Sequence, residues 1–262
     1  MNILSDIYYY VIITKSNLFH ESLLRAKLKG TSMKLKLLEK RQETGDTFSF
    51  IFLPEESVSW KAGQFIFYTI PHEDKDERGD TRHFTITTPP HEKKIKLTTR
   101  YSFQKSSSFK KALFAKEPGD IVEAKNVRGK FTIENTNQKF VFIAGGIGIT
   151  PFYSILLDLE KQHKIKDIIL IYSNKKKENI VFKEELERLK KKYAGLKIIY
   201  IFSPQHCDKE LLEDSVTDIQ NRFFYLSGPF RMVKSVEEAL KKLWVDQSKI
   251  KKDYIPGYHE ES

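Results

Sequence analysis

The chain has 262 residues, of which 40% are apolar and 31% charged, and it carries a formal net charge of +10. This length favours two domains with hydrophobic cores, and the composition excludes a disordered or a membrane-embedded protein. The single cysteine, Cys207, excludes disulfides and multi-cysteine zinc or iron–sulfur sites.

The excess of Lys and Arg is compatible with a nucleic-acid surface, an acidic protein partner or a phosphorylated ligand. Much of the lysine, however, lies on amphipathic stretches such as Lys183 to Lys192, where a solvent-exposed helix face explains it. No basic arm or known nucleic-acid motif accompanies the charge. We therefore expect no nucleic-acid partner.

Residues 1–32 are expected to be an N-terminal extension or the result of a mis-assigned start. The apolar run from Ile7 to Ile13 is too short to cross a bilayer, and no small-residue cleavage site follows a basic region. No targeting signal and no membrane span are therefore predicted, and the expected localisation is cytoplasmic.

Residues 33–135 are predicted to form a small antiparallel β-barrel. Short segments rich in aromatic and β-branched residues alternate there with polar or proline-bearing breaks. The first strand opens at Met33, and further strands are expected over Thr47 to Phe52, Gln64 to Ile70, Thr85 to Thr88 and Lys94 to Arg100. One helix is expected over Ser107 to Phe114, because serines can cap its start and a Pro-Gly-Asp turn follows it.

Residues 136–262 are predicted to form an α/β domain with a doubly wound parallel sheet and a C-terminal tail. Apolar strands alternate there with helices, which is the pattern of βαβ units. Strands are expected over Phe140 to Ala144, Asp167 to Tyr172, Leu196 to Phe202 and Arg222 to Leu226. Helices are expected over Pro151 to Gln162, Phe182 to Tyr193 and Arg231 to Leu243.

The run Gly145-Gly146-Ile147-Gly148-Ile149-Thr150-Pro151, between a buried strand and a helix, is the strongest local signal. Glycines let a ligand approach the backbone closely, and the free N–H groups at a helix start suit a pyrophosphate. The run has neither the Gly-Lys-Ser/Thr of a Walker loop nor the GxGxxG fingerprint. A nucleotide site is expected, and a tight turn without a ligand is the alternative.

The strand segment Arg82-His83-Phe84-Thr85 is the second signal. Side chains alternate along a strand, so Arg82 and Phe84 share a face on which a guanidinium can hold a phosphate and a ring can lie against a flat heterocycle. Thr85 adds a short hydroxyl at the edge of that heterocycle. Taken alone, the segment is also compatible with an ordinary strand carrying one surface arginine.

Together these stretches resemble the ferredoxin–NADP reductase superfamily, which combines an FAD-binding barrel with a pyridine-nucleotide domain. The resemblance covers about residues 34–258. It extends in order through Ala62-Gly63-Gln64-Phe65, Ser107-Ser108-Phe109-Lys110, Gly129-Lys130-Phe131, Tyr172-Ser173-Asn174-Lys175 and Ser227-Gly228-Pro229. Many relatives have cysteine where Ser227 stands, which implies a poorer contact to the nicotinamide here.

The resemblance implies roles for residues of both domains. Arg82 would bind the FAD pyrophosphate, Phe84 would lie along the flavin, and Thr85 would reach its N5/O4 edge. The other implied cofactor-binding residues are Thr87, Thr99, Arg100, Ser107 and Ser108 for FAD, and Gly145, Gly146, Gly148, Thr150, Pro151, Ser173, Asn174, Lys175, Gly228 and Pro229 for the nicotinamide nucleotide. Tyr258 would cover the flavin or, alternatively, only pack the tail. Thr85, Thr150 and Ser227 are the implied catalytic residues.

The segment after the second strand of the α/β half bears on coenzyme choice. It reads Ser173-Asn174-Lys175-Lys176-Lys177, with no acidic residue before Glu178. NAD-selective sites usually place a carboxylate on the ribose diol, and such a carboxylate repels a 2′-phosphate. The segment therefore favours NADPH, or tolerance of NADPH and NADH, over a strict NADH site. A solvated lysine loop is the alternative.

The predicted function is that of an FAD-dependent oxidoreductase that transfers hydride between NAD(P)H and flavin N5. Its partner would be a separate electron carrier, such as ferredoxin or flavodoxin. One alternative is an NAD(P)H-dependent reductase of free flavin, quinone or another small acceptor, and the other is a non-catalytic binding module on the same fold. No metal site is expected, because no histidine pair has zinc-binding spacing. His206 next to Cys207 does not by itself make that thiol a nucleophile.

Overall fold

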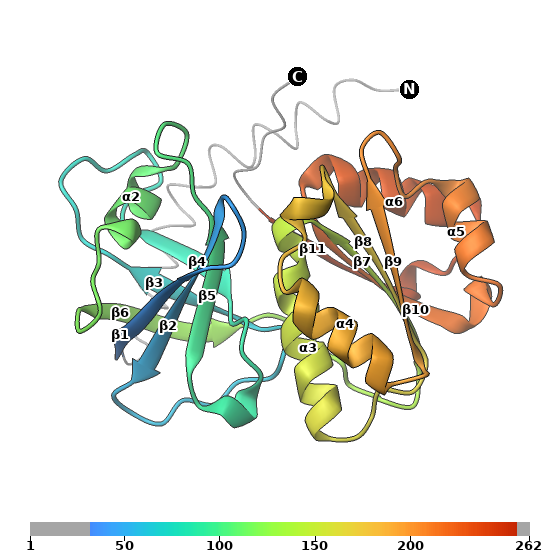
Figure 1. Cartoon of the computed structure of the whole chain (residues 1–262), viewed down its shortest axis with the longest axis horizontal. Coiled ribbons are helices and arrows are strands. Elements are labelled where there is room, and N and C mark those ends of the chain that lie inside the picture. The colour runs from blue at the N-terminus through green and yellow to red at the C-terminus, as the bar shows by residue number, and fades with distance from the viewer. Residues whose placement is uncertain (1–31, 256–262) are drawn as a thin grey trace.

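Two sheets organise the chain, and the computed structural model describes residues 32–255 of it (Figure 1). Apart from Ser32, the expected N-terminal extension lies outside the described residues, as does Tyr258. Within the described range, no helix has the length and apolar character needed to span a bilayer.

The first sheet has six antiparallel strands in the order β4-β3-β6-β1-β2-β5. These strands are β1 (Met33–Gln42), β2 (Thr47–Pro54), β3 (Phe65–Thr69), β4 (Thr81–Thr85), β5 (Ile95–Arg100) and β6 (Ile121–Arg128). The sheet curls until its edges approach, and the backbone N–H of Thr87, just after β4, donates to the carbonyl of Lys96 in β5 at 2.8 Å. The barrel expected for the first half is thereby confirmed.

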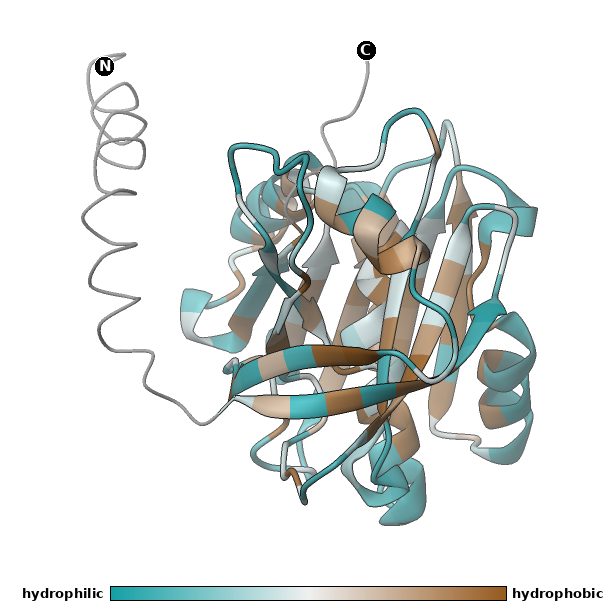
Figure 2. Cartoon of the chain, turned by 90° about the vertical axis from the view of Figure 1, so that its left-hand side faces the viewer, coloured by the Kyte–Doolittle hydropathy of each residue, from teal (hydrophilic) through white to brown (hydrophobic). Residues whose placement is uncertain are grey.

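The inside of the curled sheet is filled by alternate side chains of its strands. Leu35 and Leu37 of β1 are fully buried, whereas Lys34 and Lys36 beside them are exposed. Figure 2 shows the same alternation of apolar and polar residues along the strands nearest the viewer. Helix α2 (Ser108–Phe114) closes the barrel with Phe109 and Leu113, both fully buried, and the Ser107 side chain caps its first turn.

The second sheet has five parallel strands in the order β11-β10-β7-β8-β9. They are β7 (Lys139–Gly145), β8 (Ile168–Asn174), β9 (Leu196–Phe202), β10 (Arg222–Gly228) and β11 (Ile250–Tyr254), and the helices are α3 (Ile149–Lys161), α4 (Lys183–Lys192), α5 (Lys209–Ser215) and α6 (Phe230–Lys242). The strand order reverses between β7 and β10. The carboxyl ends of strands at such a reversal are where doubly wound sheets bind ligands.

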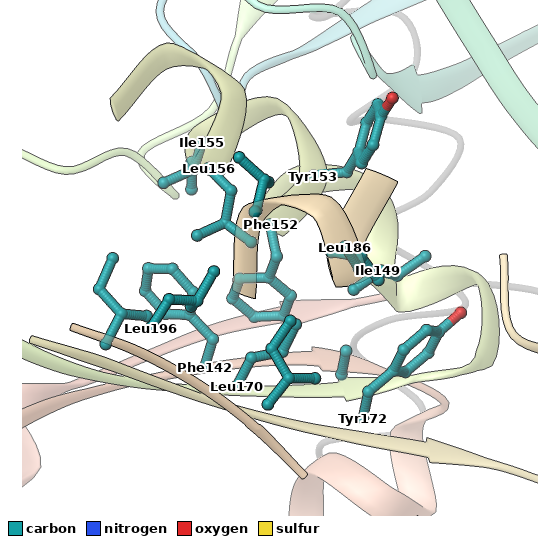
Figure 3. Close-up of a cluster of buried hydrophobic side chains, with 14 of the residues drawn as sticks. Phe142, Ile149, Phe152, Tyr153, Ile155, Leu156, Leu170, Tyr172, Leu186 and Leu196 are labelled. Carbon is teal, nitrogen blue, oxygen red and sulfur yellow. The ribbon is translucent and has the colours of Figure 1, made fainter. Parts of the chain in front are cut away.

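Helices cover both faces of the parallel sheet. Phe142 faces α3 and α4, whereas Val141 and Ile143 face α5 and α6. Figure 3 shows the α3 side, where the rings of Phe142 and Phe152 stack with centroids 4.9 Å apart. A strand buried on both faces needs a continuous apolar run, which is why β7 was evident from the sequence.

Contacts between α3 and the barrel join the two halves. Ser154 of α3 donates a hydrogen bond to the carbonyl of Thr88 at 2.9 Å. The Lys96 ammonium lies 5.4 Å from the ring centre of Tyr153 and 5.7 Å from that of Phe182. These two rings stack on each other at 4.0 Å. Burial lowers the pKa of Lys96, and the ring faces partly replace the water that the ammonium has lost.

Some elements differ from the sequence-based expectation. The strand expected over Thr85 to Thr88 runs instead over Thr81–Thr85, so the arginine motif lies inside it. Strands β6 and β11 and helix α5 were not predicted. Their sequences are short and rich in charged residues, and β11, which reads Ile-Lys-Lys-Asp-Tyr, is an edge strand that needs little apolar surface.

Candidate functional site

The glycine-rich turn leaves β7 beside the end of β10, where the strand order reverses. Strand pairing sets Ser227 opposite Ala144. A Cβ at Gly148 would lie 2.2 Å from the carbonyl oxygen of Ser227, so only glycine permits this approach. Gly146 has a φ of +52°, and nothing lies within 4 Å of the position of an added Cβ. The turn is therefore packed against β10 on one side and open on the other.

A buried tyrosine fixes the shape of this turn. Tyr172 of β8 donates a hydrogen bond to the Gly146 carbonyl at 3.1 Å and accepts one from the backbone N–H of Val181 at 3.3 Å. Burial raises the pKa of Tyr172, so its hydroxyl keeps the proton that it donates. Figure 3 shows its ring among the apolar side chains under α3 and α4. Tyr172 belongs to the Tyr172-Ser173-Asn174-Lys175 motif, but its role in bracing the turn was not predicted.

A cavity of about 880 Å³, the flavin-side cavity, lies between the barrel and the glycine turn. Its size is typical of sites for small organic ligands. The residues expected in a flavin site that line it are Arg82, Phe84, Thr85, Thr99 and Ser107, and Thr150 of α3 reaches it from the other half. Asp253 and Tyr254 of β11 complete the wall.

Arg82 is held at this cavity by the loop between β3 and β4. Its Nη1 donates to the carbonyl oxygens of Arg78 and Thr81 at 2.6 and 2.8 Å. Its Nη2 donates to Asp76 Oδ1 at 2.5 Å. Its Nε, in contrast, is buried and has no hydrogen-bond partner within residues 32–255. A buried donor without a partner is costly, and an anionic oxygen in the cavity would satisfy it.

Asp76 is a permanent carboxylate at this site. Burial opposes its ionisation, but hydrogen bonds from Arg78 and the positive charges of Arg82 and Arg78 lower the pKa of Asp76 to about 2. The Ser108 hydroxyl accepts a hydrogen bond from the backbone N–H of Asp76 at 2.9 Å. Ser108 thus anchors the loop that holds Arg82 and does not itself line the cavity.

Arg82 and Phe84 lie on one face of β4, as the sequence predicts, and both side chains contact the ring of Phe109. The Arg82 guanidinium lies 5.7 Å from the ring centre of Phe109. The ring of Phe84 stacks on the same Phe109 ring at 5.8 Å. The positive charge and the apolar ring therefore face the cavity together.

Two of the expected site residues lie behind the cavity wall. Thr87 is fully buried, and its hydroxyl has no hydrogen-bond partner in the described part of the chain. Ser227 is also fully buried and donates to Asp253 Oδ2 at 3.3 Å. Burial raises the pKa of Asp253, which lines the cavity. Asp253 was not among the predicted site residues because it lies on β11, a strand that was not predicted.

A second cavity of about 370 Å³, the nucleotide-side cavity, lies at the carboxyl ends of the parallel strands. The expected site residues that line it are Gly145, Gly146, Ser173, Asn174, Lys175 and Pro229. Arg100, expected beside the flavin, lines this cavity instead. Gly148, Pro151 and Gly228 shape the turn without lining either cavity. Ile147 lines both, so the two cavities meet at the glycine turn.

Thiol and metal chemistry find no support in the described residues. Burial raises the pKa of the Cys207 thiol to about 12, so the sulfur is protonated at neutral pH although it lines the nucleotide-side cavity. Within residues 32–255, no three His, Cys, Asp or Glu side chains gather in a way that could hold a metal ion.

Comparison with known proteins fits this arrangement. Residues 142–238 match the family model of the oxidoreductase NAD-binding domain. Flavohemoprotein B of Dictyostelium discoideum is 26% identical over 215 residues, which cover 72% of this chain and 50% of the relative. The ferredoxin reductase component of a 3-ketosteroid-9-alpha-monooxygenase from Rhodococcus rhodochrous is 30% identical over 219 residues, 80% of this chain and 61% of the relative. The chain is thus similar to a flavohemoprotein and to a ferredoxin reductase component, and its second half matches the NAD-binding family model.

A solved superfamily structure shows the same fold over nearly its whole length. A ferredoxin NADP+ reductase from Neisseria gonorrhoeae, with bound FAD and NADP, matches with a TM-score of 0.72 at 20% identity. The match covers 86% of this chain and 99% of that structure. The curated relatives are longer, and this chain spans 50% of the flavohemoprotein and 61% of the reductase component.

Proposed function

We propose that the protein is an FAD-containing oxidoreductase that takes hydride from NAD(P)H and passes electrons to a separate redox carrier protein. The observation that carries this proposal is the meeting of the two cavities at Ile147, in the glycine turn at the strand reversal. The match of residues 142–238 to the oxidoreductase NAD-binding domain and the similarity to a ferredoxin reductase component support it. In this proposal residues 33–135 form the flavin domain and residues 136–262 form the nucleotide domain.

The residues of the flavin-side cavity fit FAD. Arg82 has a buried, unpartnered Nε for a pyrophosphate oxygen. Phe84 offers an apolar ring, and Thr85 and Thr99 line the same cavity with short hydroxyl side chains. FAD, when bound, supplies a ring system that accepts hydride from a nicotinamide and releases electrons singly.

The residues of the nucleotide-side cavity fit a dinucleotide. Gly146 leaves open space where any other residue would project a side chain. Helix α6 begins directly after Pro229, has 13 residues, and has no side-chain cap or acidic residue in its first turn. Its free N–H groups and positive dipole end favour a phosphate.

The residues at the meeting point orient the reacting rings and exclude water. The Thr150 hydroxyl donates to the Ile147 carbonyl at 3.2 Å and so braces the turn that both cavities share. Thr85 lies in the wall of the same cavity. Ser227 acts indirectly in this proposal, because its hydroxyl holds the Asp253 carboxyl at the cavity edge.

Reconstitution followed by anaerobic mixing tests the proposal. Purified protein incubated with FAD should retain it through desalting, and the flavin absorbance should bleach on mixing with NADH or NADPH in a stopped-flow instrument. A reduced carrier such as ferredoxin or flavodoxin should then form faster than reduced quinone or free flavin. Protein that binds no flavin, or whose flavin neither coenzyme reduces, would show a non-catalytic module on this fold.

A further inference from the structure

We propose that Lys96 of the barrel and Phe182 of the α/β half are positioning residues for coenzyme binding, because together they hold one wall of the nucleotide-side cavity in place. This inference rests on the proposed function, since it concerns the coenzyme site named there. The features behind it are a strained backbone at Phe182, a cation that covers its ring, and hydrogen bonds that lead from Val181 to the glycine turn.

Phe182 has a backbone conformation that a large side chain rarely adopts. Its φ of +58° and ψ of +28° lie in the left-handed region, where the Cβ of any residue other than glycine crowds the backbone. The residue stands directly before α4, as its N-cap. A bulky residue keeps this conformation only where its surroundings hold it there, and such residues gather at functional sites.

The ring of Phe182 is held by a second ring from another helix. It stacks on Tyr153 of α3, with ring centres 4.0 Å apart and planes inclined by 23°. The two residues are 9% and 8% exposed, respectively. The stack therefore fixes the end of the Phe182 side chain and with it the strained backbone.

Lys96 of β5 covers this stack from the barrel. Its ammonium lies 5.4 Å from the ring centre of Tyr153 and 5.7 Å from that of Phe182. It forms no hydrogen bond or ion pair with another described residue, and Glu43 and Glu92 act on its charge from beyond ion-pair distance. Contacts between a cation and ring faces are strongest where the cation has lost water. A side chain of the barrel thus helps to hold a residue of the α/β half.

The residue before Phe182 is part of the nucleotide-side cavity. Val181 is 2% exposed and lines that cavity. Its backbone N–H donates to the Tyr172 hydroxyl at 3.3 Å, and this hydroxyl donates to the Gly146 carbonyl at 3.1 Å. If Phe182 left the left-handed region, Val181 would move and Tyr172 would lose the donor that orients its hydroxyl. The glycine turn would then lose its brace.

Lys96 and Phe182 act on the cavity from outside, because neither of them lines it. Their loss should lower the fraction of molecules whose cavity has the binding shape. The apparent affinity for the coenzyme falls by that fraction, whereas the hydride step of a bound coenzyme is unaffected. This split between affinity and rate is what separates positioning from a merely structural role.

Stopped-flow reduction of the FAD-reconstituted protein by NADPH measures both quantities in one concentration series. In Lys96→Met we expect the half-saturating NADPH concentration to rise by roughly five- to tenfold, with the limiting rate constant and the FAD content unchanged. Lys96→Arg keeps the cation and should restore most of the affinity. Lys249→Met is the matched control. Lys249 also lies over a ring, that of Phe223 at 6.0 Å, but it lines neither cavity, so NADPH affinity should not change.

Phe182→Asn tests the second positioning residue independently. Asparagine adopts the left-handed conformation more readily than phenylalanine, so the variant removes the ring without adding backbone strain. The half-saturating NADPH concentration should rise by about the same factor as in Lys96→Met. Trp244→Asn is the control, because Trp244 has a φ of +59° and is 86% exposed. It should bind NADPH like the wild type.

Several outcomes overturn the inference. Wild-type half-saturation in Lys96→Met or Phe182→Asn would do so, as would an equal rise in Lys249→Met or Trp244→Asn. Loss of FAD or of the limiting rate in step with the affinity would show a merely structural role. If Lys96→Met does not fold, Phe182→Asn decides. Failure of the proposed function looks different, because then neither NADPH nor NADH bleaches the wild-type flavin, and the inference is decided by calorimetric titration of the same variants with NADP+.

Discussion

The two cavities differ in how several of their positive charges are paired, although Arg100 on the nucleotide side is paired with Asp46, and Lys125 on the flavin side has no partner among the described residues. In the flavin-side cavity, Lys75 lies 2.8 Å from Asp80 and Arg82 lies 2.5 Å from Asp76. In the nucleotide-side cavity, Lys175 and Arg231 have no anionic partner within residues 32–255. A paired cation is oriented before a ligand arrives, whereas an unpaired cation gains a partner on binding and loses that gain as salt is added. The first arrangement suits a resident cofactor, and the second suits a coenzyme that exchanges at each turnover.

The largest expected effect comes from Gly146→Val, which should disable the nucleotide-side cavity alone. The side chain would project into the open space of that cavity, at a position with a φ of +52°. We expect flavin reduction by NAD(P)H to fall by about two powers of ten or more in single-turnover kinetics, with flavin content unchanged.

Gly119→Val is the matched control for backbone strain. Gly119 has a φ of +104° and open space around an added Cβ, but it lines neither cavity. It should lose stability without losing reduction by the coenzyme. Equal loss of reduction in both variants would mean that strain, and not occupation of the cavity, is the cause.

Arg82→Ala should weaken FAD binding in the flavin-side cavity. It removes the unpartnered Nε and leaves Asp76 without its guanidinium. A charge-assisted contact contributes about 1.5 to 3 kcal/mol, so FAD affinity should fall by roughly one to two powers of ten, measured by fluorescence titration. Binding of NADPH fragments should not change. Arg78→Ala is the control, because Arg78 also pairs with Asp76, at 3.1 Å, but has a side chain 55% exposed. A larger loss in Arg78→Ala would move the phosphate contact to that residue.

Tyr172→Phe should have a smaller effect, confined to the nucleotide side. It removes the hydrogen bonds to the Gly146 carbonyl and from the Val181 N–H. Each contributes about 1 kcal/mol, so we expect the KM for the coenzyme to rise several-fold in steady-state kinetics while FAD affinity is unchanged.

Tyr68→Phe is the counterpart in the barrel. The Tyr68 hydroxyl is buried without a hydrogen-bond partner in the described residues, so its removal should be neutral or stabilising.

The smallest expected effect concerns Asp253 and pH. Burial raises the pKa of Asp253 in the folded protein above its unfolded value. The folded state therefore binds the proton more tightly, and the stability that this provides is lost as pH rises through the folded pKa. Asp253→Asn cannot ionise, so its free energy of unfolding relative to the wild type should increase from pH 4 upward and then level off, as measured by urea unfolding. If the difference in free energy of unfolding between Asp253→Asn and the wild type did not vary with pH, the raised pKa of Asp253 would be contradicted.

Local motifs were predictable because the backbone itself demands particular residues. Gly148 had to be glycine, since a Cβ there would lie 2.2 Å from a carbonyl oxygen of the neighbouring strand. Arg82 and Phe84 share a face through strand alternation alone. The alternation of helices with apolar strands likewise predicted the parallel sheet, because its central strands β7 and β8 are buried on both faces.

Residues whose role depends on distant strands could not be found in this way. Asp253 reaches the flavin-side cavity only because β11 pairs in parallel with β10. Arg100 lies at the end of β5, and its alignment with Asp46 turned it toward the nucleotide side and not toward the flavin. Arg231 was the first residue of a predicted helix and was given no role, because the cavity that it lines is assembled from strand ends of both sheets.

The ammonium of Lys96, 5.4 Å from the ring centre of Tyr153, has a consequence for how the molecule moves and melts. A hinge between the halves would have to withdraw this cation from two rings and break the buried bond from Ser154 to Thr88. Such opening exposes apolar surface together with unsatisfied polar groups and is therefore unfavourable. On heating, the barrel and the parallel sheet should absorb heat in one shared calorimetric peak, because neither half can unfold without stripping the other of its partner surface.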